Sequence, residues 1–384
     1  MMATLPGVFF YLVTAVSIRT QGLAYPLFVA TLWLLASEGR SPTRRARVYL
    51  VFPILMLWGN LHGSATLGAG LAALYGVVVL VGGLRRDGSR ALLDRRAWLF
   101  IVISPLTLFA TPYGLSMVHY YRVTLLNSQF SRIVTEWKPV TSVPVLAIPL
   151  FLMIVLTALA IAQAWRRRGS GSVFAAGQHL AAAARPPIFD VLTLTVLAIG
   201  AVMAVRNITW FGLAVMMLLP ALITQGRGST PAPLRRTRLN RRLAMATALL
   251  TAVVSVVVLA RSTSWFTSTY PTKSLPTLHS LVAGDPRATI LADVRYADWL
   301  IWEDPGRFSG RVAYDTSFEL LTRAQLGAIA DLAAHTKDAR SVLNAYPIWM
   351  LDPGNRALDK SLLRLPHVHV VTRNHNVIIA THAT

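Results

Sequence analysis

The sequence predicts a polytopic α-helical membrane protein of about nine spans, followed by a small C-terminal α/β domain on the extracytoplasmic side. Hydrophobic residues make up 54% of the 384 residues and charged residues only 14%, which is too few to cover a soluble surface of this size. Basic residues gather in connectors between apolar runs. Only 5 of the 16 acidic residues precede Arg261. We therefore expect a boundary near Arg261 between a membrane-embedded part of the chain and a part in water.

The first 260 residues form the predicted membrane domain. A spanning helix needs about 20 mostly apolar residues. The runs that approach this length are 3–17, 22–37, 48–63, 66–83, 97–112, 144–164, 187–205, 208–224 and 243–260.

The net charge of +21 is concentrated in Arg-rich connectors. They lie at 40–47, 85–96, 166–185 and 227–242. Basic connectors beside membrane spans remain in the cytoplasm. With nine spans this rule predicts a cytoplasmic N-terminus and an extracytoplasmic tail. The connectors hold almost no aromatic residues that could stack on bases, which argues against a nucleic-acid partner.

The tail divides into a predicted linker, 261–286, and a soluble α/β domain, 287–384. Short strands are expected at 288–293, 311–314, 367–372 and 376–382, and a helix at 322–335. Four histidines near the C-terminus are interpreted as an exposed strand face rather than a metal site: His367, His369, His375 and His382. Asp293, Asp298 and Asp315 follow strand-like runs and are interpreted as turn or cap residues. The absence of cysteine excludes disulfides and thiolate metal sites.

Polar residues beside spans are costly and therefore indicate function. The predicted topology places four such clusters at the outer membrane surface, namely Arg19 with Gln21, Asn60 with His62, Glu136 with Lys138, and Arg206 with Asn207. Three of them have a structural alternative. Arg19 could anchor a helix end, Asn60 and His62 could satisfy backbone groups at a helix break, and Glu136 could pair with a nearby cation. A lone Arg at the depth of Arg206 favours an anion as its partner.

Several short motifs recur in one order. They are Arg19-x-Gln21, Trp58-x-Asn60-x-His62-Gly63, Pro112-Tyr113-Gly114, Glu136-Trp137 and Arg206 in a tight hairpin. Together they resemble bacterial members of the GT-C superfamily, the multi-span membrane glycosyltransferases that use polyprenyl-phosphate-linked sugars outside the cytoplasm. The segments 296–302 and 311–315 are similar to the periplasmic tail of uncharacterised proteins in that group.

The resemblance implies roles for these residues. Arg19 and Arg206 would hold the lipid phosphate, with Gln21 and Asn207 beside them. Asn60 and His62 would line the donor pocket, and Trp137 would also bind substrate. Glu136 would be the catalytic carboxylate, orienting an acceptor or sugar hydroxyl or acting as the base. The implied partners are membrane lipids and the lipid-linked sugar. No metal ligand is identified in the sequence, and a divalent cation remains open as the cofactor.

One departure from the family pattern concerns its first outer loop, which normally carries an Asp. The first outer residues here hold no carboxylate. The chain thus resembles an enzyme that lacks its N-terminal spans. The expected explanations are a truncated chain, a mis-assigned start or a family member that has lost activity, and a partner membrane protein could supply the missing spans. The alternative function is a non-catalytic membrane protein that binds a lipid-linked sugar or a partner enzyme. Transport is less favoured, because no carboxylate lies at the centre of a span.

Overall fold

The structure is a computed structural model. It describes residues 7, 21–40, 42–126, 129–169, 187–225, 237–285, 287–333, 345–354 and 366–382. The chain forms two compact units. Unit 1 comprises Met1–Leu126 and Val134–Ala232, and unit 2 comprises Asn127–Ile133 and Pro233–Thr384. Arg19 and the predicted span 3–17, apart from Gly7, lie outside the described residues.

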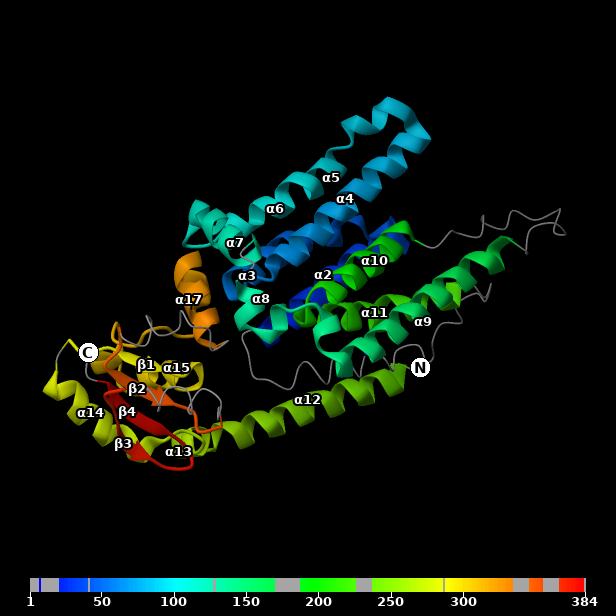
Figure 1. The fold of residues 1–384 in the computed structure, drawn as a ribbon. Coiled ribbons are helices and arrows are strands. Elements are labelled where there is room, and N and C mark those ends of the chain that lie inside the picture. Colours follow the sequence, from blue (N-terminus) through cyan, green and yellow to red (C-terminus); the bar gives the residue numbers. More distant parts are fainter. Residues whose placement is uncertain are drawn as a thin grey trace, which may run out of the picture. The chain divides into compact units, whose positions relative to one another are not determined.

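Unit 1 is helical in its described part. Its helices are α2 (Gln21–Arg40), α3 (Val51–Leu61), α4 (Ala65–Asp87), α5 (Arg95–Trp98), α6 (Ser104–Leu106), α7 (Met117–Leu126), α9 (Pro144–Gly169), α10 (Ile188–Met203) and α11 (Ile208–Gln225). The helices α9, α10 and α11 pack side by side (Figure 1).

Aromatic side chains fill the core of unit 1. Phe28 of α2 and Trp58 of α3 lie against Trp210 of α11, with ring centroids 5.1 and 5.9 Å apart. Trp58 also lies against the backbone of α4 at Gly68, where a Cβ atom would stand 2.5 Å from the Trp58 ring. Gly68 is therefore required for the close approach of α3 and α4.

Three helical segments among the described residues are long and apolar enough to cross a membrane. They are Ala65–Leu93, Pro144–Arg166 and Val205–Ile223, and a bent pair, Arg95–Phe109 with Gly114–Leu125, would add a fourth. These segments support a membrane protein. They contradict the prediction of nine spans.

Hydropathy overcounted the spans because it measures composition and not the length of an unbroken helix. Several predicted spans coincide with apolar helical stretches of only 10–17 residues, namely Ala46–Leu61, Ile188–Met203 and Ala244–Leu259, the last being the apolar part of a longer helix. These are shorter than the roughly 20 residues that cross a bilayer. The run 97–112 ends at a break where the chain bends by 99°.

The described part of unit 2 contains a long apolar helix and a small α/β fold. Its elements are α8 (Phe130–Ile133), α12 (Thr237–Leu259), α13 (Thr263–Thr267), α14 (Leu275–Gly284), β1 (Ile290–Ala292), α15 (Val294–Glu303), α16 (Pro305–Phe308), α17 (Arg323–Ala333), β2 (Ile348–Leu351), β3 (Val368–Arg373) and β4 (Ile378–His382).

The strands form a sheet in the order β1-β2-β4-β3. β1 and β2 are parallel, and the other pairs are antiparallel. The helices α14, α15 and α16 cover one face of the sheet through Leu278, Leu300 and Phe308. Leu332 of α17 packs against the other face. A two-sided core explains why β2 is buried at every position.

Three of the four expected strands overlap β1, β3 and β4, and the expected helix overlaps α17. In the expected strand 311–314 the structure shows a single bridge between Ile290 and Val312. β2 was not predicted, because its run of four apolar residues lacks alternation. The stretch predicted as a linker contains α13 and α14, and Leu278 and Val282 of α14 are buried in the core.

Candidate functional site

Three of the predicted polar clusters lie in the segments that lead into the long apolar helices of unit 1. His62 precedes α4, Lys138 precedes α9, and Arg206 precedes α11. Glu136 and Trp137 belong to a short 3-10 helix, Thr135–Trp137, and Arg206 and Asn207 belong to another, Val205–Asn207. The amide of Val205 donates to the carbonyl oxygen of Lys138 at 3.1 Å. This hydrogen bond brings two of the clusters side by side.

The side chains of Arg206 and Trp137 stack. The guanidinium carbon of Arg206 lies 4.3 Å from the centre of the Trp137 ring, and both side chains are half-buried. A cation over a tryptophan face is attracted by the ring, and more strongly where water is excluded. Glu136, the neighbour of Trp137, is also half-buried. The structure thus places a cation, an indole and a carboxylate in two adjoining turns.

The imidazole of His62 is electrostatically linked to the same group. Burial and the positive charge of Arg206 lower the pKa of His62 to about 4. The amide of Ser64 donates to Nδ1 of His62 at 3.0 Å, so Nδ1 is an acceptor and the ring hydrogen resides on Nε2. His62 is therefore neutral at pH 7 and can still donate a hydrogen bond through Nε2.

The two predicted asparagines have structural partners. Nδ2 of Asn60 donates to the carbonyl oxygens of Met56 and Ala110, both at 2.8 Å. Nδ2 of Asn207 donates to the carbonyl oxygen of Gly200 at 2.9 Å, at the end of α10. Both amides satisfy backbone carbonyls where helices break, which is the structural alternative that the sequence left open for Asn60.

The start of α2 belongs to the same end of unit 1. Gln21, its first residue, is 8% exposed. One turn later Tyr25 packs edge-on against Trp210, with ring centroids 5.1 Å apart. Because Trp210 lies in the first turn of α11, the N-terminal ends of α2 and α11 are neighbours.

Two further residues complete this end and were missed in the sequence. The hydroxyl oxygen of Ser64 lies 2.7 Å from Nδ1 of His62 and accepts from Nε1 of Trp58 at 3.1 Å. The hydroxyl of Tyr120 packs against Gly63, where a Cβ atom would be 2.6 Å away. A serine two residues after a histidine at a helix start was the available signal for Ser64. Tyr120 had none, because α7 is distant in sequence.

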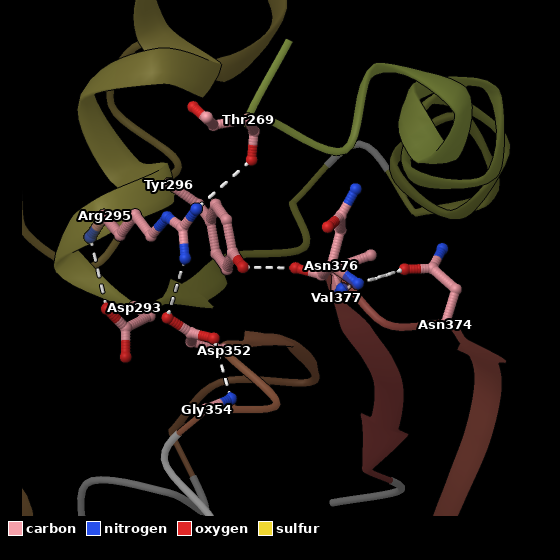
Figure 2. Close-up of polar contacts among 9 residues, drawn as sticks. All are labelled: Thr269, Asp293, Arg295, Tyr296, Asp352, Gly354, Asn374, Asn376 and Val377. Carbon is pink, nitrogen blue, oxygen red and sulfur yellow. Dashed lines mark hydrogen bonds and ion pairs between the residues drawn. The ribbon is translucent and has the colours of Figure 1, made fainter. Parts of the chain in front are cut away.

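The tail carries a separate polar group at the carboxyl ends of β1 and β2 (Figure 2). Asp293 accepts from the Arg295 amide and caps α15, and Nη1 of Arg295 lies 3.2 Å from Oδ2 of Asp352. Burial raises the pKa of Asp293. The predicted cap role of Asp293 is confirmed.

The other two aspartates also bond to backbone amides. Asp298 accepts from the amide of Thr316, and Asp315 accepts from the amide of Ser317. No group of three or more His, Asp or Glu side chains able to hold a metal ion is found among the residues that the structure describes.

The end of unit 1 that carries Arg206 is suited to an anion. Helix N-termini carry partial positive charge and unpaired amide groups, and α4 and α11 begin shortly after His62 and Arg206. Arg206 adds a full charge, His62 adds a neutral donor, and Glu136 adds a carboxylate that can accept a proton. Comparisons with protein-family models, curated proteins and solved structures find no match for this chain.

Proposed function

We propose that this membrane protein binds the phosphate of a polyprenyl-phosphate-linked sugar at Arg206 and transfers the sugar to an acceptor hydroxyl. The observation that carries the proposal is the stack of Arg206 on Trp137 at the N-terminal ends of the apolar helices. A lipid-linked anion fits this combination, because its chain would lie along apolar helices while its phosphate meets the positive end.

The arrangement of Arg206 suits a phosphate in particular. Its guanidinium is stacked by one face, and its N–H donors lie in the guanidinium plane, where they match two phosphate oxygens. The neutral His62 would donate a further hydrogen bond through Nε2. Arg19, in the resemblance, would be a second cation on the same phosphate.

Glu136 would provide the chemistry of transfer. The acceptor oxygen attacks the anomeric carbon of the sugar while its proton passes to the Glu136 carboxylate. The bond from the anomeric carbon to the phosphate oxygen breaks, and the polyprenyl phosphate leaves with its charge held by Arg206. A positioned base contributes roughly 10²–10⁴-fold to such a step.

The extracytoplasmic side is the proposed location of this end. Arg85 and Arg86 lie at the opposite end of α4, and Arg166 lies at the opposite end of α9. Basic residues beside spans favour the cytoplasm. The helix ends that carry His62 and Lys138 would then face outward.

A non-catalytic sugar-lipid binder is the second candidate. It is favoured by the distribution of carboxylates in the described part of unit 1, where Glu136 alone is beside Arg206. The others belong to the opposite helix ends, namely Glu38, Asp87, Asp94 and Asp190. One carboxylate can act as a base but leaves no second one to hold a cation.

Photo-crosslinking with a polyprenyl-phosphate probe tests the binding step in the reconstituted full chain. Arg206→Ala should reduce labelling at least tenfold, and Arg206→Lys should restore part of it. Arg86→Ala is the matched control, because Arg86 is exposed at the opposite end of α4. Equal labelling of the wild type and Arg206→Ala would contradict the proposal. Glu136→Gln should leave labelling unchanged and abolish sugar transfer, whereas a pure binder transfers no sugar in either form.

A further inference from the structure

The segment after α12 joins an apolar helix to the core of the tail. The apolar part of α12, Ala244–Leu259, exposes its large side chains within unit 2, with Leu250 64% and Leu259 84% exposed. Arg261 follows, and then α13 presents two adjacent aromatic side chains. Trp265 is 53% exposed and Phe266 is 45% exposed. Two large exposed rings at the end of an apolar helix need an environment other than bulk water.

The side chains of this segment form an ordered group. The guanidinium carbon of Arg261 lies 5.4 Å from the centre of the Trp265 ring. The rings of Trp265 and Phe266 meet edge-on with centroids 4.9 Å apart. The hydroxyl of Ser268 donates to the carbonyl oxygen of Trp265. Aromatic rings with a polar edge and a neighbouring Arg are typical of the boundary between lipid and water.

The same segment is attached to the tail a few residues later. Tyr270 stacks on Trp299 of α15 with centroids 5.5 Å apart and ring planes within 9°. Nη2 of Arg295 donates to the carbonyl oxygen of Thr269 at 3.3 Å (Figure 2). Trp299 is only 4% exposed. The chain between Phe266 and Thr269 is therefore too short to act as a free linker.

We infer that α13 is an anchor in the headgroup region of the bilayer, with the rings of Trp265 and Phe266 inserted and Arg261 bound to lipid phosphate. The anchor fixes the C-terminal end of α12 and holds the tail directly at the membrane surface. Lipid is the occupant because the rings continue the apolar surface of α12. The stretch between Arg242 and Asp285 also holds no acidic residue, so its charge suits anionic headgroups.

The absence of cysteine permits a direct test with single spin labels in the full chain. A nitroxide at Ser264→Cys lies between the anchor residues, and one at Ser309→Cys is the exposed control in the tail. The chain is reconstituted into vesicles of phosphatidylcholine and phosphatidylglycerol without other proteins. The label at residue 264 should collide more with oxygen and less with a water-soluble nickel chelate than the label at residue 309.

The double variant Trp265→Ala with Phe266→Ala should move the label at residue 264 to the accessibility of residue 309. An unchanged spectrum of the label at residue 309 shows that the tail remains folded. Equal accessibility at residues 264 and 309 in the unaltered segment would overturn the inference. Protection of residue 264 from both reagents would also overturn it, because it indicates contact with protein instead of lipid.

Discussion

The helix α11 of unit 1 and the apolar segment Ala244–Leu259 of α12 in unit 2 are both rich in large apolar side chains, but these side chains are buried to very different degrees, each within its own unit. In the segment Val205–Ile223, 61% of an 18-residue apolar stretch is buried inside the protein. The large side chains along the apolar part of α12 are instead exposed. Met245 near its start is 62% exposed, and Leu259 at its end is 84% exposed. Hydropathy thus identifies an apolar helix, but it does not predict whether the apolar side chains of that helix are buried inside the protein.

The largest expected effect on stability is the difference between two matched substitutions, one leucine to alanine in each helix. Leu218 of α11 is 0% exposed and Leu250 of α12 is 64% exposed. Leu218→Ala should lower the free energy of unfolding by about 2–5 kcal/mol, because it leaves a cavity. Leu250→Ala should change it by less than about 0.5 kcal/mol. Unfolding by sodium dodecyl sulfate in mixed micelles measures both, and equal costs would remove the distinction between the two helices.

The polar end that precedes α11 should also respond to pH. The pKa of His62 is about 4 in the folded protein, against an ordinary value of 6.5. Between these values the unfolded chain binds more protons, so the free energy of unfolding falls as the pH drops from about 6.5 towards 4. Above pH 6.5 this contribution is constant. Because the ring is only partly buried and water screens part of the effect, the loss is on the order of 1 kcal/mol rather than the full value of the shift.

Unfolding measured at pH 7.5 and pH 4.5 tests this titration. His62→Gln cannot titrate and should lose less stability on acidification than the wild type. The same loss in both proteins would show that His62 is not held neutral by its surroundings.

A buried and an exposed environment can also be compared at two contacts between an arginine and a tryptophan ring. Arg206 lies 4.3 Å from the half-buried ring of Trp137, and Arg261 lies 5.4 Å from the exposed ring of Trp265. Trp137→Leu should destabilise the fold by about 2 kcal/mol, and Trp265→Leu by about 0.5–1 kcal/mol, because cation–π attraction is stronger away from water. The same unfolding assay provides the ranking, and a reversed order would contradict the burial of the first stack.

The smallest effect is expected at an exposed ion pair in unit 2. Nη2 of Arg132 in α8 lies 2.8 Å from Oδ1 of Asp331 in α17, with side chains 45% and 30% exposed. Asp331→Ala should cost about 0.2–1 kcal/mol, as is usual for exposed pairs. The exchanged pair, Arg132→Asp with Asp331→Arg, should recover most of that loss. Failure to recover would mean that packing, and not charge, joins these helices.

The sequence predicted the positions of the polar clusters better than the number of spans. His62, Glu136 and Arg206 could be singled out because polar residues next to apolar runs are costly and few, and their role as a site remains a prediction. The stack of Arg206 on Trp137 could not be predicted, because it depends on how helices far apart in the chain pack. The span count was wrong because a run such as 97–112 is apolar throughout and still bends at its end.

The most direct test of the proposed phosphate site at Arg206 compares two ligands that differ only in the phosphate group. Equilibrium binding of a polyprenyl phosphate and of the corresponding polyprenol is measured for the full chain in lipid nanodiscs. The wild type should prefer the phosphate by at least tenfold, and Arg206→Ala should bind both ligands equally, because an unpaired charge typically costs about 2–5 kcal/mol. A preference that persists in Arg206→Ala, or its absence from the wild type, would contradict the assignment of Arg206 to the lipid phosphate.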